Sequence, residues 1–226
     1  GAYYVASKDG ENRFKVGKSR LEFSFEYPWY FEQRPNEQYV MLSNYLSACV
    51  DLNKRKEFDD GYELLRDLHR KVKAGLLKVK IKERLHILPF FMAHTEGSLD
   101  ELSDKFVDDF CAFGLELPSH SISWGIMHWY QVSAAFLAMH HGKSRKASRM
   151  LDVLREDSQV KTSEFHLKKV LMLELCVLIS FDRINLIESK LNSFKYHIKA
   201  KNWNLSDEET VFLNFVEHLR PAKGLE

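Results

Sequence analysis

The stretch from Pro118 to Asp157 constrains the fold of this chain more than any other part of the sequence. A long apolar segment, residues 122–141, is followed by Gly142 and then by a shorter amphipathic segment, residues 145–157. Glycine adopts the left-handed backbone conformation that ends many helices at little steric cost. The stretch therefore predicts two antiparallel α-helices joined by a tight turn at Gly142.

Weaker copies of this pattern precede and follow it. Predicted turn positions recur about 40–45 residues apart, at Asn53, Gly97, Gly142 and Asp182. Five residues after each turn come Phe58, Leu102, Ala147 and Ile187, and four residues later come Tyr62, Phe106, Leu151 and Leu191. Helix pairs that stack on their neighbours produce such a register, so the sequence predicts a helical-repeat protein.

Apolar positions three to four residues apart predict the individual helices. The predicted ranges are 35–52, 57–73, 77–95, 99–113, 122–141, 145–157, 164–181, 184–201 and 207–219. Pro35 suits a first helical position, and Pro89 is expected to bend the third helix. Ser98 and Ser206 each stand three residues before a glutamate, which predicts a capping box at the start of a helix.

Gly75 and Gly114 are predicted to end the second and fourth helices. Residues 1–17 show no clear period and are expected to form an irregular leader. Ser19 is predicted to cap a short helix over residues 21–27, although alternating apolar residues there also fit a strand.

We expect an all-α fold, a right-handed α-α superhelix of about four antiparallel helix pairs with a C-terminal capping helix. Residues 1–34 would hold the leader and a short N-terminal helix, residues 35–220 the repeat domain, and residues 221–226 a tail. The abrupt start at Gly1 leads us to expect a fragment or processed piece of a longer protein.

Charge and cysteine content narrow the classes of function. Lysine and arginine number 33 against 32 acidic residues, a net charge of +1, which argues against a dedicated nucleic-acid binder. Cys49, Cys111 and Cys176 form no CxxC pair, so we expect buried, reduced thiols and a cytoplasmic location. No apolar run reaches the roughly 18 residues that a membrane-spanning helix needs.

The residues around Gly142 resemble the turn of a tetratricopeptide (TPR) repeat. In that family a glycine closes the first helix, an alanine five residues on lets the helices approach, and a large apolar residue follows. Gly142, Ala147 and Leu151 fit these positions. Over roughly residues 38–219 the chain is similar to divergent TPR-like proteins, uncharacterised proteins that are common in Bacteroidetes-type bacteria. Its period is longer than the usual ~34 residues; a HEAT-like array has this period but lacks the Gly-x4-Ala turn chemistry found here.

The resemblance implies that the first helix of each pair lines a concave groove that binds a peptide or a helix. The implied groove residues are Arg84, Ile87, Phe91, Trp129, Phe136, Met139, His140, Lys169, Met172 and Cys176. The alternative is that these long helices bury the same side chains in their own core.

Other candidate sites carry weaker signals. His128, His140 and His141 invite a metal site, but adjacent histidines on a helix point about 100° apart. Asp104 and Asp108 have the spacing of a carboxylate pair. A basic stretch, residues 66–84, and an acidic one, residues 96–116, would bind phosphate or a charged partner, or would simply be solvated helix faces.

No nucleotide-binding, hydrolase or kinase motif occurs in the sequence. We therefore expect a non-catalytic scaffold with a protein or peptide partner and with no cofactor, metal, nucleic acid or membrane; self-association is a further option. The alternatives are an enzyme with an unrecognised groove site around Trp129, His140 and Asp104, or a regulatory module of a longer protein.

Overall fold

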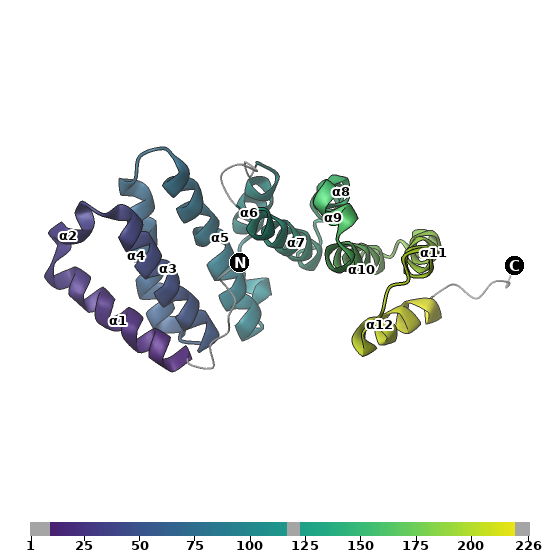
Figure 1. Cartoon of the computed structure of the whole chain (residues 1–226), viewed down its shortest axis with the longest axis horizontal. Helices are drawn as coiled ribbons and strands as arrows, with labels where there is room; N and C mark the ends of the chain where they lie inside the picture. The colour runs from purple at the N-terminus through teal and green to yellow at the C-terminus, as the bar shows by residue number, and fades with distance from the viewer. Residues whose placement is uncertain (1–9, 117–122, 220–226) are drawn as a thin grey trace, which may run out of the picture. The chain divides into compact units, whose positions relative to one another are not determined.

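The computed structural model describes residues 10–116 and 123–219, and these residues fold entirely into helices and connecting turns (Figure 1). Within those ranges no β-strand is present, so the predicted all-α fold is confirmed. No helix in the same ranges combines the length and the apolar character required to cross a lipid bilayer.

The chain divides into two compact units, with the boundary between Phe106 and Val107. The first unit contains α1 (Gly10–Glu26), α2 (Pro28–Glu32), α3 (Pro35–Asp51), α4 (Arg55–Lys71), α5 (Leu76–Glu96) and the 3-10 turn η1 (Leu99–Glu101). The boundary falls inside α6 (Asp104–Glu116). The second unit continues with α7 (Trp124–His140), α8 (Ser144–Glu156), α9 (Ser158–Thr162), α10 (Glu164–Ser180), α11 (Ile184–Lys201) and α12 (Asp207–His218).

Helices in each unit pack on their neighbours in sequence. In the first unit α3 packs against α1 and α4, and α5 packs against both α3 and α4. In the second unit α10 packs in the same way against α7 and α8, and then against α11. The first helix of a hairpin thus covers both helices of the hairpin before it, which is the nearest-neighbour packing of repeat proteins.

The apolar positions that predicted the helices form the two cores. Side chains that are fully buried include Leu42, Leu46, Leu65 and Ile81 in the first unit, and Ala134, Leu137, Ala147, Met150, Leu154 and Phe194 in the second. Ala147 has no exposed surface in the α7–α8 hairpin, as expected of a small residue where two helices approach closely.

The turns that end α3, α5, α7 and α10 share one backbone geometry. Their turn residues have left-handed φ angles of 50° at Asn53, 71° at Gly97, 68° at Gly142 and 52° at Asp182. The next residue donates its N–H to the carbonyl five positions back: Lys54 to Cys49, Ser98 to Ala93, Lys143 to Ala138 and Arg183 to Leu178. These are Schellman motifs, and all four predicted turn positions are confirmed. The same geometry at Asn202, with φ of 51°, was not predicted.

The helix favoured over residues 21–27 falls largely within α1, but the predicted irregular leader and the Ser19 cap were wrong where the structure describes them. Residues 10–26 form one helix, so residues 10–17 are not irregular and Ser19 lies inside α1 instead of capping a helix. Gly17 is buried against α3, where an added Cβ would lie 3.1 Å from Tyr45 Cδ2. The glycine that suggested irregular structure therefore allows α1 to approach α3 closely.

Three other predicted helix ends were also wrong. Gly75 precedes α5, because α4 already ends at Lys71 and Val72 is extended. Gly114 lies inside α6, in a close contact with the ring of Tyr130. Ser98 makes no capping bond and precedes η1, whereas the hydroxyl of Ser103 accepts the N–H of Phe106 near the start of α6.

At the C-terminal end the predicted capping box is present. The Ser206 hydroxyl accepts the N–H of Glu209, and Glu209 accepts the N–H of Ser206 at the start of α12. The hydroxyl of Ser163 accepts the N–H of His166 at the start of α10. The short helices α2 and α9 were not predicted.

Candidate functional site

Helix α10 presents two opposite faces in the second unit. Phe165, Lys169 and Met172 lie on one face at helical spacing, and Leu167 and Leu171 lie on the other. The first face contains the groove residues predicted from sequence and adjoins α7. It is the candidate partner-binding face, which we define by Trp129, Phe165, Lys169 and the half-buried Met172.

A lysine held by two exposed aromatic rings forms the centre of this face. The ammonium nitrogen of Lys169 lies 4.4 Å from the ring centroid of Trp129 on α7 and 4.0 Å from that of Phe165 on α10. Trp129 is 47% exposed and Phe165 is 54% exposed, although both rings are large and apolar. Burial lowers the pKa of Lys169. Cation–π contacts of this kind orient the lysine while leaving one ring face free for another molecule.

A second aromatic cluster lies beside the first, at the N-terminal ends of α7 and α10. The imidazole of His128 stacks on the Trp124 ring with centroids 5.2 Å apart, and the His166 ring meets both edge-on at 4.5 and 4.6 Å. Trp124 donates its indole N–H to Asp157 Oδ2 at 2.8 Å. Asp157 also caps α9, so the cluster ties α7 to the α8–α9 junction.

His128 is a buried polar group without compensation. The residue is only 2% exposed, and within the described part of the chain neither ring nitrogen finds a hydrogen-bond partner. Burial, together with the neighbouring His166, lowers the pKa of His128 to about 4. The pKa of His166 is also lowered, mainly by burial. Both imidazoles are therefore neutral near pH 7, and His128 costs folding free energy as an unpaired group.

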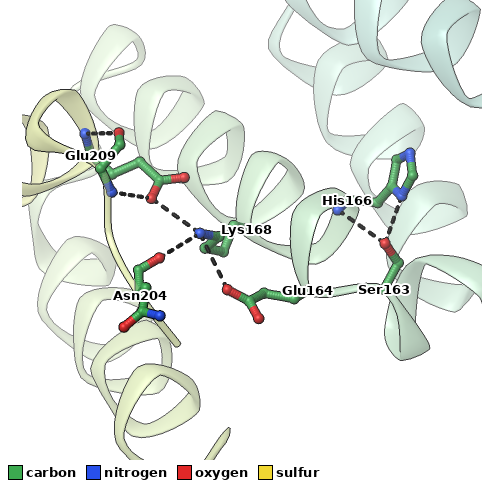
Figure 2. Close-up of polar contacts among 7 residues, drawn as sticks. Ser163, Glu164, His166, Lys168, Asn204 and Glu209 are labelled. Carbon is green, nitrogen blue, oxygen red and sulfur yellow. Dashed lines mark hydrogen bonds and ion pairs between the residues drawn. The ribbon is translucent and has the colours of Figure 1, made fainter. Parts of the chain in front are cut away.

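Lys168, next to the half-buried Lys169, contacts the last helix and the loop before it (Figure 2). Its ammonium donates to the backbone carbonyl of Asn204 at 2.8 Å and forms ion pairs with Glu209 at 3.1 Å and Glu164 at 3.4 Å. Glu209 belongs to the capping box of α12. The side chain of Lys168 is only 11% exposed, so this network fixes α12 and the preceding loop to α10.

The structure brings some of the predicted residues together and separates others. Trp129 and Lys169 are in contact, and the ring of Phe136 stacks 6.4 Å from that of His140 two turns further along α7. Met139 is half-buried on the same helix. Trp129 and His140 are eleven residues apart on α7, about 16 Å along its axis, so they do not form one catalytic site.

In the first unit the predicted residues have mixed exposure. Ile87 is 5% exposed and lies in the core, because it faces the helices on which α5 packs. Arg84 is half-buried and forms an ion pair of 3.5 Å with Glu83, and Phe91 is half-buried beside Phe90. Ile87 is therefore not available on a surface.

Sequence reasoning did not find Phe165, Trp124, His166 or Asp157 as members of a site. A signal was present, because Trp124 and His128, and Phe165 and Lys169, are spaced four residues apart and so share a helix face. The metal hypothesis for the histidines has no geometric support: among residues 10–116 and 123–219, no group of three His, Cys, Asp or Glu could hold an ion.

Comparisons with known proteins identify no relative. No family model, curated protein or solved structure matches this chain.

Proposed function

We propose that this protein is a non-catalytic interaction module whose candidate partner-binding face docks an extended peptide or helix of another protein. One observation carries the proposal: Trp129 and Phe165 stay half exposed while both rings hold the Lys169 ammonium. Burying two such rings would contribute several kcal/mol to binding, and aromatic residues are enriched at the centres of interfaces.

The charge on this face defines the chemistry of the partner. The ammonium of Lys169 lies between apolar rings, so it would favour a carboxylate that stands next to an apolar side chain in the partner. The contact would extend along α7 and α10 over Phe136, Met139, His140 and Met172. Arg84 and Phe91 are the corresponding predicted positions on α5 in the first unit.

The finer architecture belongs to the same proposal. A TPR-like, right-handed superhelical array is supported by the four Schellman turns and, within each unit, by the packing of α5 on α3 and α4 and of α10 on α7 and α8. A cytoplasmic location is supported by the cysteines at positions 49, 111 and 176, which are all free thiols in the structure.

Selection of peptides from a random display library tests the function. The wild-type chain is expected to enrich peptides that combine an apolar residue with a nearby Asp or Glu. A Trp129→Ala/Phe165→Ala variant should lose at least about tenfold in affinity for them, because the aromatic anchors are gone. Tyr196→Ala is the matched control, since Tyr196 is a 70% exposed aromatic residue on α11, away from this face. Equal affinity of both variants would disprove the proposal.

A further inference from the structure

A second surface feature lies on the opposite side of α10 from the candidate partner-binding face. Here a cavity of about 410 Å³ opens among α8, α9, α10 and α11, all within the second unit. Its lining consists of Arg155, Lys161, Leu167, Leu171, Glu174, Lys190, Ser193, His197 and Lys201. This volume is in the range of cavities that bind small organic molecules.

The lining is strongly cationic. Four of the lining side chains are lysine or arginine, and Glu174 supplies the one carboxylate. A single oxygen of Glu174, Oε1, accepts both Arg155 at 3.1 Å and Lys190 at 2.7 Å. Glu174 is 7% exposed, so it acts as a buried anchor that holds two cations at the cavity wall. Arg155 also approaches Asp152, at 3.9 Å.

The other two lysines keep their charge uncompensated. Within the described ranges neither Lys161 nor Lys201 forms an ion pair, while Lys201 donates to the backbone carbonyl of Lys161 at 3.4 Å. Lys201 also lies 5.7 Å from the ring centroid of Trp203. These contacts hold the Lys201 ammonium beside α9, at the same end of the cavity as Lys161.

The remaining lining adds donors and an apolar floor. Lys190, Ser193, His197 and Lys201 recur at helical spacing and give α11 one polar, donor-rich face. Leu167 and Leu171 of α10 supply apolar surface next to it. A ligand that satisfies both parts carries an anionic group and a small apolar body.

We propose that this cavity binds a small organic phosphate, with the phosphate between Lys161 and Lys201 at one end and the apolar body on Leu167 and Leu171. Lys161 and Lys201 bring two positive charges that no ion pair within the described ranges offsets, which suits a phosphate close to the dianionic state better than a carboxylate. The site is separate from the proposed peptide-binding face and does not depend on it.

Titration calorimetry of the whole chain with phenyl phosphate, inorganic phosphate and benzoate tests the proposal. Phenyl phosphate is expected to bind most tightly, and its affinity should fall as salt is added. Lys161→Gln/Lys201→Gln should weaken it by at least about tenfold, because two charge-assisted contacts are lost. Arg183→Gln/Lys199→Gln removes the same charge from exposed residues outside the cavity and should leave the affinity within about twofold.

A variant that makes the cavity more positive, instead of less positive, provides a second test of the proposal. Glu174→Gln removes the one carboxylate of the lining and should tighten phenyl phosphate binding by up to about threefold, because the cavity becomes more positive while the contacts to the phosphate are unchanged. Circular dichroism shows whether the Glu174→Gln variant is folded. If it is not folded, the lysine variants still test the proposal. The proposal is overturned if phenyl phosphate does not bind up to about 5 mM, or if benzoate or inorganic phosphate binds equally well. Equal weakening by both double variants would also overturn it.

Discussion

The ammonium of Lys168 on α10 forms an ion pair of 3.1 Å with Glu209 at the start of α12, across 41 residues of sequence. The two side chains are 11% and 20% exposed, and each has further partners: Lys168 also bonds Asn204, and Glu209 also caps α12. A charged pair this shielded from water holds the last helix in one position.

Replacing Lys168 with methionine should therefore loosen α12. We expect a loss of about 2–4 kcal/mol in the free energy of unfolding, since the Glu209 carboxylate, which is only 20% exposed, loses its ammonium partner. Hydrogen exchange should report faster exchange in α12 and the preceding loop, with little change in α7 and α8.

Lys195→Met provides the control for this experiment. Lys195 on α11 also forms an ion pair with α12, through Glu217, but both side chains are more than a third exposed. Such a pair contributes less than about 1 kcal/mol. If both variants lose the same stability, the Lys168 network has no special role.

The lowered pKa of His128 predicts that the second unit loses stability as the pH falls. Its pKa of about 4 in the folded protein lies below its ordinary value of 6.5, so the unfolded chain binds the proton more readily. Stability is then complete above about pH 6.5 and falls with acidification down to about pH 4, by at most 1.4 kcal/mol per pH unit. His128→Leu should flatten this slope and leave stability at pH 7 equal or higher, because two unpaired nitrogens are removed.

The measurement is urea unfolding at several values between pH 4 and pH 7. His166 faces His128 and its pKa is shifted in the same direction, so part of the slope should remain in the variant. His140→Leu, an exposed replacement on the same helix, should keep the full slope. A variant at position 128 that retains the wild-type slope would show that His128 is not the titrating group.

Substitutions at two helical glycines test whether the absence of a side chain at each position affects stability. A Cβ on Gly61 would lie 3.0 Å from Leu46 Cδ2 and 3.0 Å from Tyr45 Cε1, both in the core, whereas no residue that the structure describes lies within 4 Å of a Cβ on Gly125. We expect Gly61→Ala to lower stability by about 1–3 kcal/mol through overpacking. Gly125→Ala should raise it by about 0.5–1 kcal/mol, because alanine favours the helix. Thermal unfolding of the two variants shows whether their effects have opposite signs.

The sequence predicted the turns better than it predicted the helix starts. A helix end of the Schellman type is decided by a few adjacent residues, so local chemistry was sufficient at Gly97 and Gly142. Gly17 lies inside α1 and packs against Tyr45 of α3, far along the chain. A glycine in a tertiary contact looks the same in sequence as a glycine in a loop, and the same ambiguity explains Gly114.

The candidate site could be predicted only in part. Helical periodicity and the resemblance placed Trp129 and Lys169 on one surface, and their side chains do meet. The cluster around His128 could not be assembled, because it depends on the approach of Asp157 and His166 from other elements. The basic cavity was missed although Lys190, Ser193, His197 and Lys201 share one face of α11. Partner binding at either surface stays a prediction.

The shared turn geometry gives a final prediction at Asp182, one of the two predicted turn positions that are not glycine. Asp182 has a φ of 52°, a conformation that a residue with a Cβ adopts only at a cost of roughly 1 kcal/mol. Asp182→Gly should therefore raise stability by about 0.5–1 kcal/mol, and Asp182→Ala should lower it, because alanine lacks the polar side chain that eases this conformation. Chemical denaturation of the three proteins measures the order Gly, Asp, Ala. An alanine variant as stable as the glycine variant would mean that this turn does not require the left-handed conformation that it shares with Gly97 and Gly142.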